Sequence, residues 1–485
     1  MKWETVIGLE VHAELSTKTK IFCSCSTAYG AEPNTNVCPG CAGMPGTMPV
    51  LNKNVVEYAL RLGIALNCDI AGECRFDRKN YYYPDLPKAY QVSQLYAPIC
   101  KNGFLEIDIP DANGTGKKKI NLHQIHMEED AGKLVHSPNE TYMDFNRGGT
   151  PLLEIVSKPD FRNADEVIAY LEKLRETLLY LEICDCKMEE GSFRADVNLS
   201  VRPFGGELGV RTEMKNINSF KAIKAAIEYE ENRHIDVLEE GGRLVQETRR
   251  WDDEKGGSFA MRTKENAQDY RYFPDPDLLP VMIDEEWLNR VKTTLPELAH
   301  QKRERYAEDY GISEAEAAVL TSHKKIADLF ENIINNSVET QNARFALEAA
   351  HLITGEILRL MNNTNTLPED LSVDAGKLSV LITMVLTGKI NRSTYKETAE
   401  AVYLHNADPE KYIEEKGLMM LDDSDEVKKA VEEMMNENQD SVSDYRSGKE
   451  KVFGFLMGQV MKKLGGRGNP ETVKKLLESM LKNGN

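Results

Sequence analysis

The sequence predicts an α+β protein: a β-rich antiparallel cradle domain with flanking helices, then an all-α helical domain and a small α-helical tail domain. Two observations support this fold class. In roughly the first 290 residues, short segments alternate apolar and polar side chains, as strands with one buried face do. Beyond about residue 295, helical periodicity takes over and Gly and Pro are confined to joints. We therefore expect domains at residues 1–293, 294–407 and 408–485.

The composition is that of a large globular chain. It has 485 residues, 41% of them hydrophobic, which is enough for substantial cores. No apolar run approaches the roughly 20 residues that span a bilayer, and no signal-peptide pattern precedes the first strand. We therefore expect a cytoplasmic protein without membrane contact. The net charge of −19 argues against simple wrapping of nucleic acid, although it is compatible with a local basic patch.

The first expected strand is GLEVHAEL, residues 8–15. Glu10, His12 and Glu14 alternate with aliphatic residues, so a strand would place all three on one face and the aliphatic residues on the other. The aliphatic face belongs in a core. Three ionisable groups on the opposite face are unusual for a strand so close to the N-terminus.

A cysteine-rich loop follows at residues 23–41, with the spacing C-x-C-x12-C-x2-C. In an intracellular chain, two close cysteine pairs are typical of a zinc knuckle rather than of disulfides. Four thiolates fill a tetrahedral site, so zinc would order the loop and do no chemistry. Unligated or redox-active thiols are the alternative. The predicted zinc ligands are Cys23, Cys25, Cys38 and Cys41.

Three later segments repeat the pattern of one apolar and one charged face, with one helix expected between the first two of them and another after the third. The segments are residues 124–130, 194–201 and 210–215, and the helices are expected at 163–181 and 219–240. For any single segment, an ordinary antiparallel sheet with one solvated face is the alternative. However, these faces carry His, Asn, Asp and Glu more than Lys and Thr, so a preference for strand-forming residues does not explain their composition.

If the four segments share one sheet, their acidic residues converge on one surface. Magnesium prefers carboxylate oxygens and keeps water and phosphate oxygens as further ligands. Arg194 and Lys215 among those acids would suit phosphate charge. The sequence has no G-x-x-x-x-G-K-[ST] loop, so a phosphate site here would depend on metal and basic side chains.

The last segment of the chain is helical and basic. From residue 441 onward, nine Lys or Arg stand against four Asp or Glu. An acidic protein can bind RNA if its basic groups lie where the RNA does. A solvated basic helix pair is the alternative.

Taken together, these segments resemble the B subunits of the bacterial and organellar aspartyl/glutamyl-tRNA(Asn/Gln) amidotransferases. In this order, the matching segments are GLEVHAEL, KNYYYPDLPKAYQ, HMEEDAGK, DFNRGGTPLLEIV, MEEGSFRADVNLSV, RTEMKNINSF, QETRRW and DYRYFPDPDLLP. The tail segments GKEKVFGFLMGQVMKK and NPETVKKLL resemble the same family's tRNA-interacting domain. The resemblance covers essentially the whole chain.

The resemblance implies an enzyme subunit that works in a heterotrimer with an amidase-type A subunit and a small C subunit. This subunit would use ATP and Mg²⁺ to phosphorylate the side-chain carboxylate of Glu-tRNA(Gln), Asp-tRNA(Asn) or both. Ammonia released from glutamine by the A subunit would then displace phosphate. No residue here resembles an amidase serine with its lysine partners, which agrees with glutamine hydrolysis in another chain. Some family members lack the four cysteines, which implies a structural zinc.

The resemblance and the polar strand faces together suggest the site residues. The expected Mg²⁺ ligands are Glu10, His12, Glu128 and Glu213, with Asp130, Glu190 and Asp196 as further catalytic candidates. His12 could instead hold a water or an acid in place, because imidazole is a less usual Mg²⁺ ligand. The expected contacts to ATP or phosphate are Lys88, Arg194 and Lys215. The expected tRNA contacts are Lys449, Lys451, Lys462, Lys463 and Arg467.

Two other functions are compatible with the pattern. A tRNA-binding scaffold without catalysis would retain tRNA but turn over no ATP. A stand-alone ATP-dependent amide ligase would use free ammonia on a small acid, and it would leave the basic tail unexplained.

Overall fold

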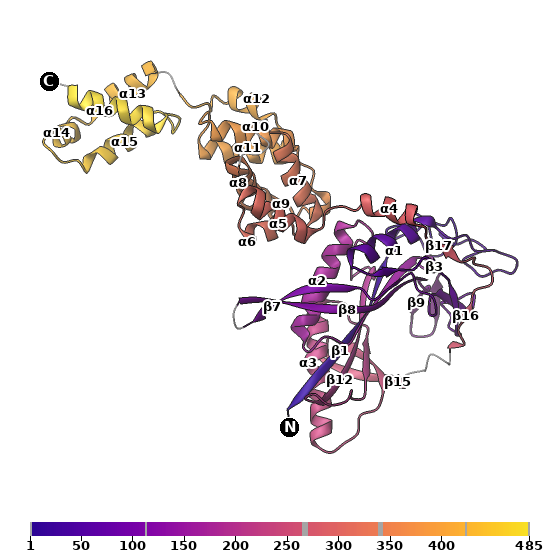
Figure 1. Ribbon diagram of the computed structural model, residues 1–485. Helices are drawn as coiled ribbons and strands as arrows, with labels where there is room; N and C mark the ends of the chain where they lie inside the picture. Colours follow the sequence, from indigo (N-terminus) through magenta and orange to yellow (C-terminus); the bar gives the residue numbers. More distant parts are fainter. Residues whose placement is uncertain (1, 112–113, 264–269, 338–342, 422–423, 484–485) are drawn as a thin grey trace. The chain divides into compact units, whose positions relative to one another are not determined.

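A computed structural model describes residues 2–111, 114–263, 270–337, 343–421 and 424–483 (Figure 1). The chain divides into two compact units, Met1–Leu298 and Ala299–Asn485. The described strands all lie in the first unit, and the second unit is helical. The predicted α+β fold class is thus confirmed. The division of the helical part at residues 407–408 stays a prediction.

A ten-stranded sheet forms the centre of the first unit. Nine strands run in the order β15-β14-β13-β12-β1-β11-β8-β6-β2, and β7 pairs with β8. The four polar segments predicted from the sequence all belong to this sheet. The strands are β1 (Trp3–Glu14), β2 (Asp69–Ile70), β6 (Cys100–Lys101), β7 (Phe104–Asp111), β8 (Gly114–Glu129), β11 (Pro151–Ser157), β12 (Phe193–Pro203), β13 (Thr212–Lys215), β14 (Glu247–Asp252) and β15 (Gly257–Thr263).

The strand register places the polar residues of neighbouring strands side by side. Between β1 and β12, Glu10 lies opposite Asp196 and His12 lies opposite Arg194. On the other side of β1, His12 lies opposite Glu154 of β11. Directly opposed residues have Cβ atoms about 4.5–5.5 Å apart, so their side chains can interact. The ionisable residues of at least four strands therefore meet on one face.

One pair in the sheet departs from the expected antiparallel arrangement. Strands β13 and β14 pair in parallel, with Glu213 opposite Thr248. Helix α3 (Phe220–Glu239) connects them. Parallel neighbours need such a crossover, because a tight hairpin reverses the chain direction.

Two helices cover the apolar face of the sheet (Figure 1). Helix α2 (Ala164–Tyr180) begins after Asn163, whose side chain accepts from the amide of Glu166. Helix α3 is capped in the same way by Ser219. Both helices lie where the sequence predicts them, and their apolar residues share one core with the aliphatic residues of β1 and β12. The polar residues of these strands are thereby left on the opposite face.

Smaller elements surround the sheet. Strands β4 (Asp77–Asn80), β5 (Tyr90–Ser93) and β16 (Phe273–Pro274) form a three-stranded sheet, so two segments far apart in the sequence lie together. Two two-stranded sheets and two helices complete the unit. They are β3 (Glu73–Cys74) with β17 (Val281–Met282), β9 (Lys133–His136) with β10 (Thr141–Asp144), α1 (Lys53–Ala65) and α4 (Glu285–Thr293).

The second unit contains two separate buried clusters of apolar residues. One lies among the helices from α5 to α12, and the other among α13 to α16. The helices are α5 (Ala299–Tyr310), α6 (Glu314–Leu320), α7 (Lys324–Asn335), α8 (Ala343–His351), α9 (Leu358–Thr364), α10 (Ala375–Leu386), α11 (Arg392–His405), α12 (Pro409–Glu415), α13 (Ser424–Glu437), α14 (Gln439–Arg446), α15 (Val452–Lys463) and α16 (Pro470–Asn483), with a π-helical turn at Leu352–Ile357 and a 3-10 turn at Pro368–Asp370. Within the described part of the chain, no helix combines the length and apolarity needed to cross a bilayer.

Candidate active site

Three carboxylates from three strands form the first group on the polar face. We call Glu10, Asp196 and Glu213 the Glu10 cluster, because their carboxylate oxygens lie within 4.8 Å of one another. Two neighbours orient these acids: Asn198 Nδ2 donates to Glu10 at 3.0 Å, and Thr248 Oγ1 donates to Glu213 at 2.9 Å. The carboxylates are therefore held in fixed positions, as metal ligands usually are.

His12, Glu128 and Glu154 form the second group, the His12 cluster. His12 Nε2 lies 3.5 Å from a carboxylate oxygen of each glutamate. His126 also contacts both glutamates, with its Nε2 3.0 Å from a carboxylate oxygen of Glu154 and 3.9 Å from one of Glu128. Since Glu10 and His12 are two residues apart on β1, the two clusters are neighbours on one strand face.

The charges in the His12 cluster shift several pKa values. Burial disfavours the charged imidazolium of His12, but Glu154 and Glu128 outweigh it and raise its pKa to about 9. Burial would raise the pKa of Glu154, yet His126 and His12 hold it well below the usual range. Burial and the nearby Glu154 raise the pKa of Glu128. Two carboxylates here thus depend on protonated imidazoles, or on another cation, to balance their charge.

These residues fit a magnesium ion. Burial, Glu154 and Asp196 raise the pKa of Glu10, and burial and Glu154 raise the pKa of Glu128, so neither carboxylate is fully compensated by the protein's own cations. A divalent cation would supply that compensation, and carboxylate oxygens are the ligands Mg²⁺ prefers. The four ligands expected from the sequence divide between the two clusters, Glu10 and Glu213 in one and His12 and Glu128 in the other.

Lys215 and Arg194, two of the three predicted phosphate contacts, flank the clusters. Lys215 Nζ pairs with Asp196 and lies 3.4 Å from Glu213. Arg194 Nη2 lies 2.7 Å from Asp130, and Arg194 Nε has no hydrogen-bond partner although it is buried. A buried guanidinium nitrogen without a partner is costly unless a ligand satisfies it. The rest of the Arg194 side chain is partly exposed, so its guanidinium is accessible to an anion such as phosphate.

Asp130 belongs to a third group with Arg194, Arg147 and Glu14. Arg147 Nε lies 3.7 Å from Asp130. Burial would raise the pKa of Asp130, but the two arginines lower it. Burial and the neighbouring Asp130 raise the pKa of Glu14 to about 9, so this carboxyl is protonated at neutral pH. Glu14 thus lies with the arginines and Asp130 rather than in either metal cluster.

The structure places the remaining two predicted residues elsewhere. Lys88 pairs with Glu129 and faces a cavity of about 230 Å³ that also borders the cysteine-rich loop. Glu190 lies in the turn before β12, where it pairs with Lys187 at 3.2 Å. Among the described residues, neither belongs to the Glu10 or His12 cluster.

Glu154 is the residue that reading the sequence missed. It stands in the run PLLEIVS of β11, where it is the only charged side chain. A single acid in an otherwise apolar strand is the signal that could have identified it, because burying a carboxylate is costly without a partner.

Three tyrosines stand beside the His12 cluster. Tyr81 packs edge-on against Tyr270, with ring centroids 5.8 Å apart, and Tyr270 packs against Tyr272 at 6.2 Å. Burial, together with the negative charge of Glu128, raises the pKa of Tyr81 and Tyr272. Two segments nearly 190 residues apart thus supply an aromatic wall next to the carboxylates.

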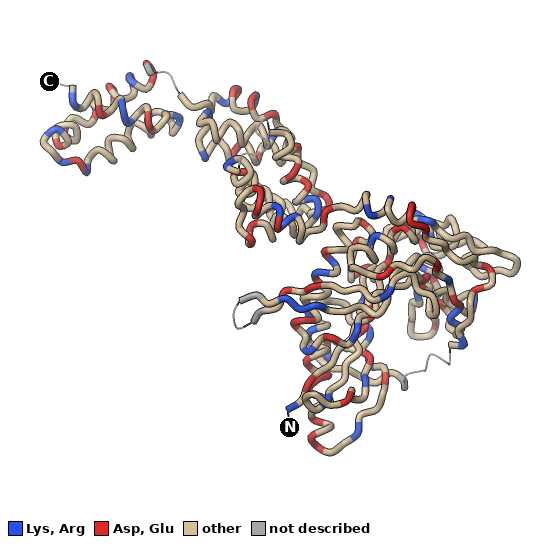
Figure 2. The backbone as a smooth tube through the Cα atoms, in the orientation of Figure 1, with Lys and Arg blue, Asp and Glu red and all other residues tan. Residues whose placement is uncertain are grey.

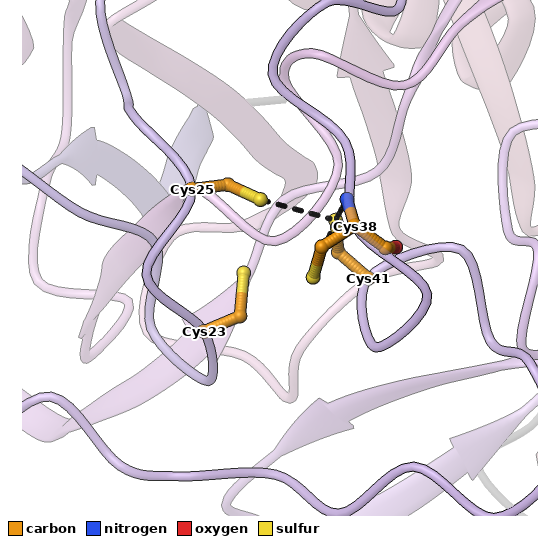
Figure 3. A group of neighbouring side chains, drawn as sticks. All are labelled: Cys23, Cys25, Cys38 and Cys41. Atoms are coloured by element: carbon orange, nitrogen blue, oxygen red, sulfur yellow. Dashed lines mark hydrogen bonds between the residues drawn. The ribbon is translucent and has the colours of Figure 1, made fainter.

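The four cysteines of the loop face one another (Figure 3). Their sulfur atoms lie within 4.8 Å of each other, and Cys41 Sγ is 3.8 Å from Cys38 Sγ and 4.0 Å from Cys25 Sγ. Four sulfurs bound to zinc at about 2.3 Å in a tetrahedron would be about 3.8 Å apart. The cysteines therefore fit a closed zinc site. The amide of Cys38 also donates to Cys41 Sγ at 3.1 Å.

The predicted tRNA contacts lie in the tail, where basic and acidic residues are interspersed (Figure 2). Lys462 and Lys463 end helix α15, whereas Lys449, Lys451 and Arg467 lie in the turns before and after it. Lys449, Lys451, Lys462 and Lys463 are exposed, and Arg467 is half-buried. Three of the five already have partners in the chain. Lys449 pairs with Asp444, Lys463 with Glu437, and Arg467 donates to the carbonyl of Gly417.

Comparison with known proteins places these features in a family. A model described as the GatB/GatE catalytic domain matches residues 5–289, and one described as the GatB domain matches 328–481. The chain is 54% identical to the B subunit of the aspartyl/glutamyl-tRNA(Asn/Gln) amidotransferase of Lachnoclostridium phytofermentans, covering 99% of both chains. The proteins of the same name from Caldicellulosiruptor bescii and Thermoanaerobacter pseudethanolicus are 51% and 50% identical, over 99% of this chain and at least 99% of theirs.

Proposed function

Because the chain belongs to the family of aspartyl/glutamyl-tRNA(Asn/Gln) amidotransferase B subunits, we propose that it activates the misacylated amino acid for amidation. It is a subunit of a tRNA-dependent amidotransferase. In the proposed reaction it transfers the γ-phosphoryl group of ATP to the side-chain carboxylate of Glu-tRNA(Gln) or Asp-tRNA(Asn). Ammonia then attacks the acyl carbon, phosphate leaves, and the amide nitrogen loses a proton.

The activation step follows from the chemistry of carboxylates. A carboxylate is a poor acyl acceptor for ammonia because its leaving group would be oxide. Phosphorylation turns that oxygen into part of a good leaving group. The protein's task is to align the γ-phosphate with the carboxylate and to balance the negative charge.

The observation that carries the proposal is the convergence of the Glu10 and His12 clusters beside Lys215 and Arg194. The two clusters would hold Mg²⁺. Bound there, the ion would offset charge on the phosphates of ATP. Lys215 and Arg194 would contact phosphate oxygens directly, and the partial exposure of both side chains beside the clusters supports this role.

We assign the other functions of the enzyme to its partners and to the tail. An amidase-type A subunit would hydrolyse glutamine and deliver ammonia, with a small C subunit completing the heterotrimer. The exposed lysines of the tail would meet the tRNA through its phosphates, with little base recognition. Zinc in the cysteine-rich loop would be structural.

The deciding experiment is an amidation assay with the purified complex. It supplies Glu-tRNA(Gln) or Asp-tRNA(Asn), ATP, Mg²⁺ and ammonium, and it measures amidated product and ATP-derived phosphate. We expect product with at least one tRNA, and phosphate release that requires the misacylated tRNA. Retention of tRNA without any amide product would contradict the proposal and favour a binding scaffold. Amidation of a free acid without tRNA would favour a stand-alone ligase.

A further inference from the structure

Lys20 is a buried charge that the proposed reaction does not use. Its side chain is buried, with 0% exposure, and the residue stands in the sequence between β1 and the cysteine-rich loop. Its Nζ donates to the carbonyl oxygen of Phe145 at 3.0 Å and lies 3.7 Å from Cys41 Sγ. A buried ammonium is stable only where partners compensate it. Lys20 therefore joins one cysteine of the loop to the segment 144–149.

Backbone and side-chain hydrogen bonds join the cysteine-rich loop to the same segment at a second place. The amide of Asn36 donates to the Asn146 side chain at 2.8 Å. The amide of Asn34 donates to the Asp144 side chain at 3.0 Å. The segment 144–149 is thus held by the loop both at its start and next to Lys20.

The other side of this segment supports the candidate active site. Arg147 donates to the carbonyls of Ala131 at 3.0 Å and Gly132 at 2.8 Å. The amide of Gly149 donates to the carbonyl of Asp130 at 2.8 Å. Asp130 in turn holds Arg194 at 2.7 Å. A continuous set of hydrogen bonds therefore runs from the cysteines through segment 144–149 to the arginine beside the metal clusters.

We propose that Lys20 is a positioning residue that couples the metal-loaded cysteine site to segment 144–149, and through it to Asp130 and Arg194. Four thiolates around a divalent ion leave a net charge of about −2, and the ammonium of Lys20 offsets part of it. The same ammonium fixes the Phe145 carbonyl. The cysteine site does no chemistry in this account, but its occupancy sets the position of the arginines. Their use in catalysis rests on the proposed function.

Zinc affinity gives the first test. We compare Lys20→Met, which keeps the length of the side chain without its charge, with Lys18→Met, an exposed lysine on the same segment. The full-length, zinc-loaded chain competes with a chromogenic chelator for zinc. We expect Lys20→Met to lower zinc affinity by about 10- to 100-fold, the usual effect of losing an outer-shell partner. Wild-type affinity in Lys20→Met would overturn the proposal.

Hydrogen exchange gives the second test. Amides of residues 145–150 should exchange about tenfold faster in Lys20→Met than in wild type or Lys18→Met, because local opening becomes easier when a buried anchor is lost. Stripping zinc from the wild-type chain should accelerate the same amides, which tests the coupling even if Lys20→Met folds poorly. Faster exchange confined to residues 20–41 would mean that Lys20 stabilises only the cysteine-rich loop, and it would refute the coupling to segment 144–149. Neither measurement depends on amidation, so failure of the proposed function would leave both readouts unchanged.

Discussion

Glu154 is the residue whose charge organises the His12 cluster. It lies between two imidazoles, 3.5 Å from His12 and 3.0 Å from His126, and both lower its pKa. It also raises the pKa of His12 to about 9 and that of Glu10. Beside the effects of burial and of the other carboxylates, one carboxylate on β11 thus contributes to the pKa shifts of two residues on β1, so its removal should affect both clusters.

Replacing Glu154 with Gln should lower ammonia-dependent amidation and raise the Mg²⁺ concentration needed for half-maximal rate by about 10-fold or more, since a ligand or its close partner is lost. Titration of Mg²⁺ in the amidation assay measures both effects. Glu106→Gln, an exposed acid on β7, is the matched control and should behave as wild type. An unchanged Mg²⁺ requirement in Glu154→Gln would remove this residue from the metal site.

Glu10→Ala should abolish ammonia-dependent amidation, because Glu10 lies in the carboxylate cluster and is oriented by Asn198. Glutaminase activity of the complex should persist, since that reaction is assigned to the A subunit. The two activities are measured on one preparation, as amide on tRNA and as glutamate released from glutamine. Amidation at the wild-type rate would refute a direct role for Glu10, and loss of both activities would point to misassembly.

We expect Glu230 of α3 to stabilise the fold at neutral pH and to lose this contribution in acid. Burial alone would raise its pKa, but hydrogen bonds from His234, Arg233 and Ser258 lower it to about 2. A carboxyl with a depressed folded-state pKa stabilises the fold above its unfolded pKa of about 4.3 and loses that contribution as the pH falls toward 2. Its contribution at neutral pH is about 3 kcal/mol.

Urea unfolding of wild type and Glu230→Gln tests this prediction. The difference in unfolding free energy between wild type and Glu230→Gln should be largest at pH 6–7 and should shrink below about pH 4.5. At low pH the wild-type carboxylate becomes protonated and loses its stabilising contribution, which the glutamine variant lacks at every pH. Glu228→Gln, exposed on the same helix, controls for the loss of a charge. A gap that does not depend on pH would show that packing, not ionisation, accounts for the effect.

At the scale of elements, the crossover from β13 through α3 to β14 determines how the Glu10 cluster is built. It brings Thr248 of β14 beside Glu213 of β13 in parallel register. Helix α3 fills the space behind the sheet with Ala222, Ile223 and Ile227, which are all buried. The same crossover therefore packs the core through α3 and places the Thr248 hydroxyl where it orients the Glu213 carboxylate.

The cysteine-rich loop should contain about one zinc per chain, because its four sulfurs fit one closed tetrahedral site. Elemental analysis of the purified protein measures this. Cys23→Ser should lose most of the metal, whereas Cys74→Ser, at a buried cysteine outside the loop, should keep it. A wild-type protein without zinc, with the cysteines reduced, would contradict the assignment.

At the scale of the whole molecule, charge is distributed unevenly. The chain carries a net charge of −19, yet the last 45 residues hold nine basic and four acidic residues.

The structure also indicates where the tail can be removed. Ile413 of α12 is buried in the core of helices α5–α12, so a cut at residue 408 would expose that core. Removing residues 422–485 leaves it intact.

A chain lacking residues 422–485 should use tRNA less well while its ATP requirement stays the same. We expect the apparent KM for misacylated tRNA to rise about 10-fold, and its dependence on salt to weaken, because lysine–phosphate contacts are lost. The KM for ATP should change less than twofold, since the clusters lie in the first unit. Unchanged tRNA use would remove the tail from the proposed function.

The sequence by itself determined the strand and helix types, the starts of helices α2 and α3, and the cysteine site. It could do so because these depend on local periodicity, on side chains within four positions of a helix start, or on spacing within one loop. It also identified the polar faces of the strands, because alternation along β1 separates Glu10 and His12 from the aliphatic core. The family resemblance came from the same segments.

Only the tertiary structure decided which polar residues meet. Register across β1, β11 and β12 put Glu154 beside His12 and Asp196 beside Glu10, and it divided the expected magnesium ligands into two clusters. Packing placed Lys88 at the cavity beside the cysteine-rich loop and Glu14 beside Asp130. The physical reason is that side-chain alternation fixes the face of a strand but not its neighbour. That neighbour is chosen by backbone pairing and core packing between residues far apart in the sequence.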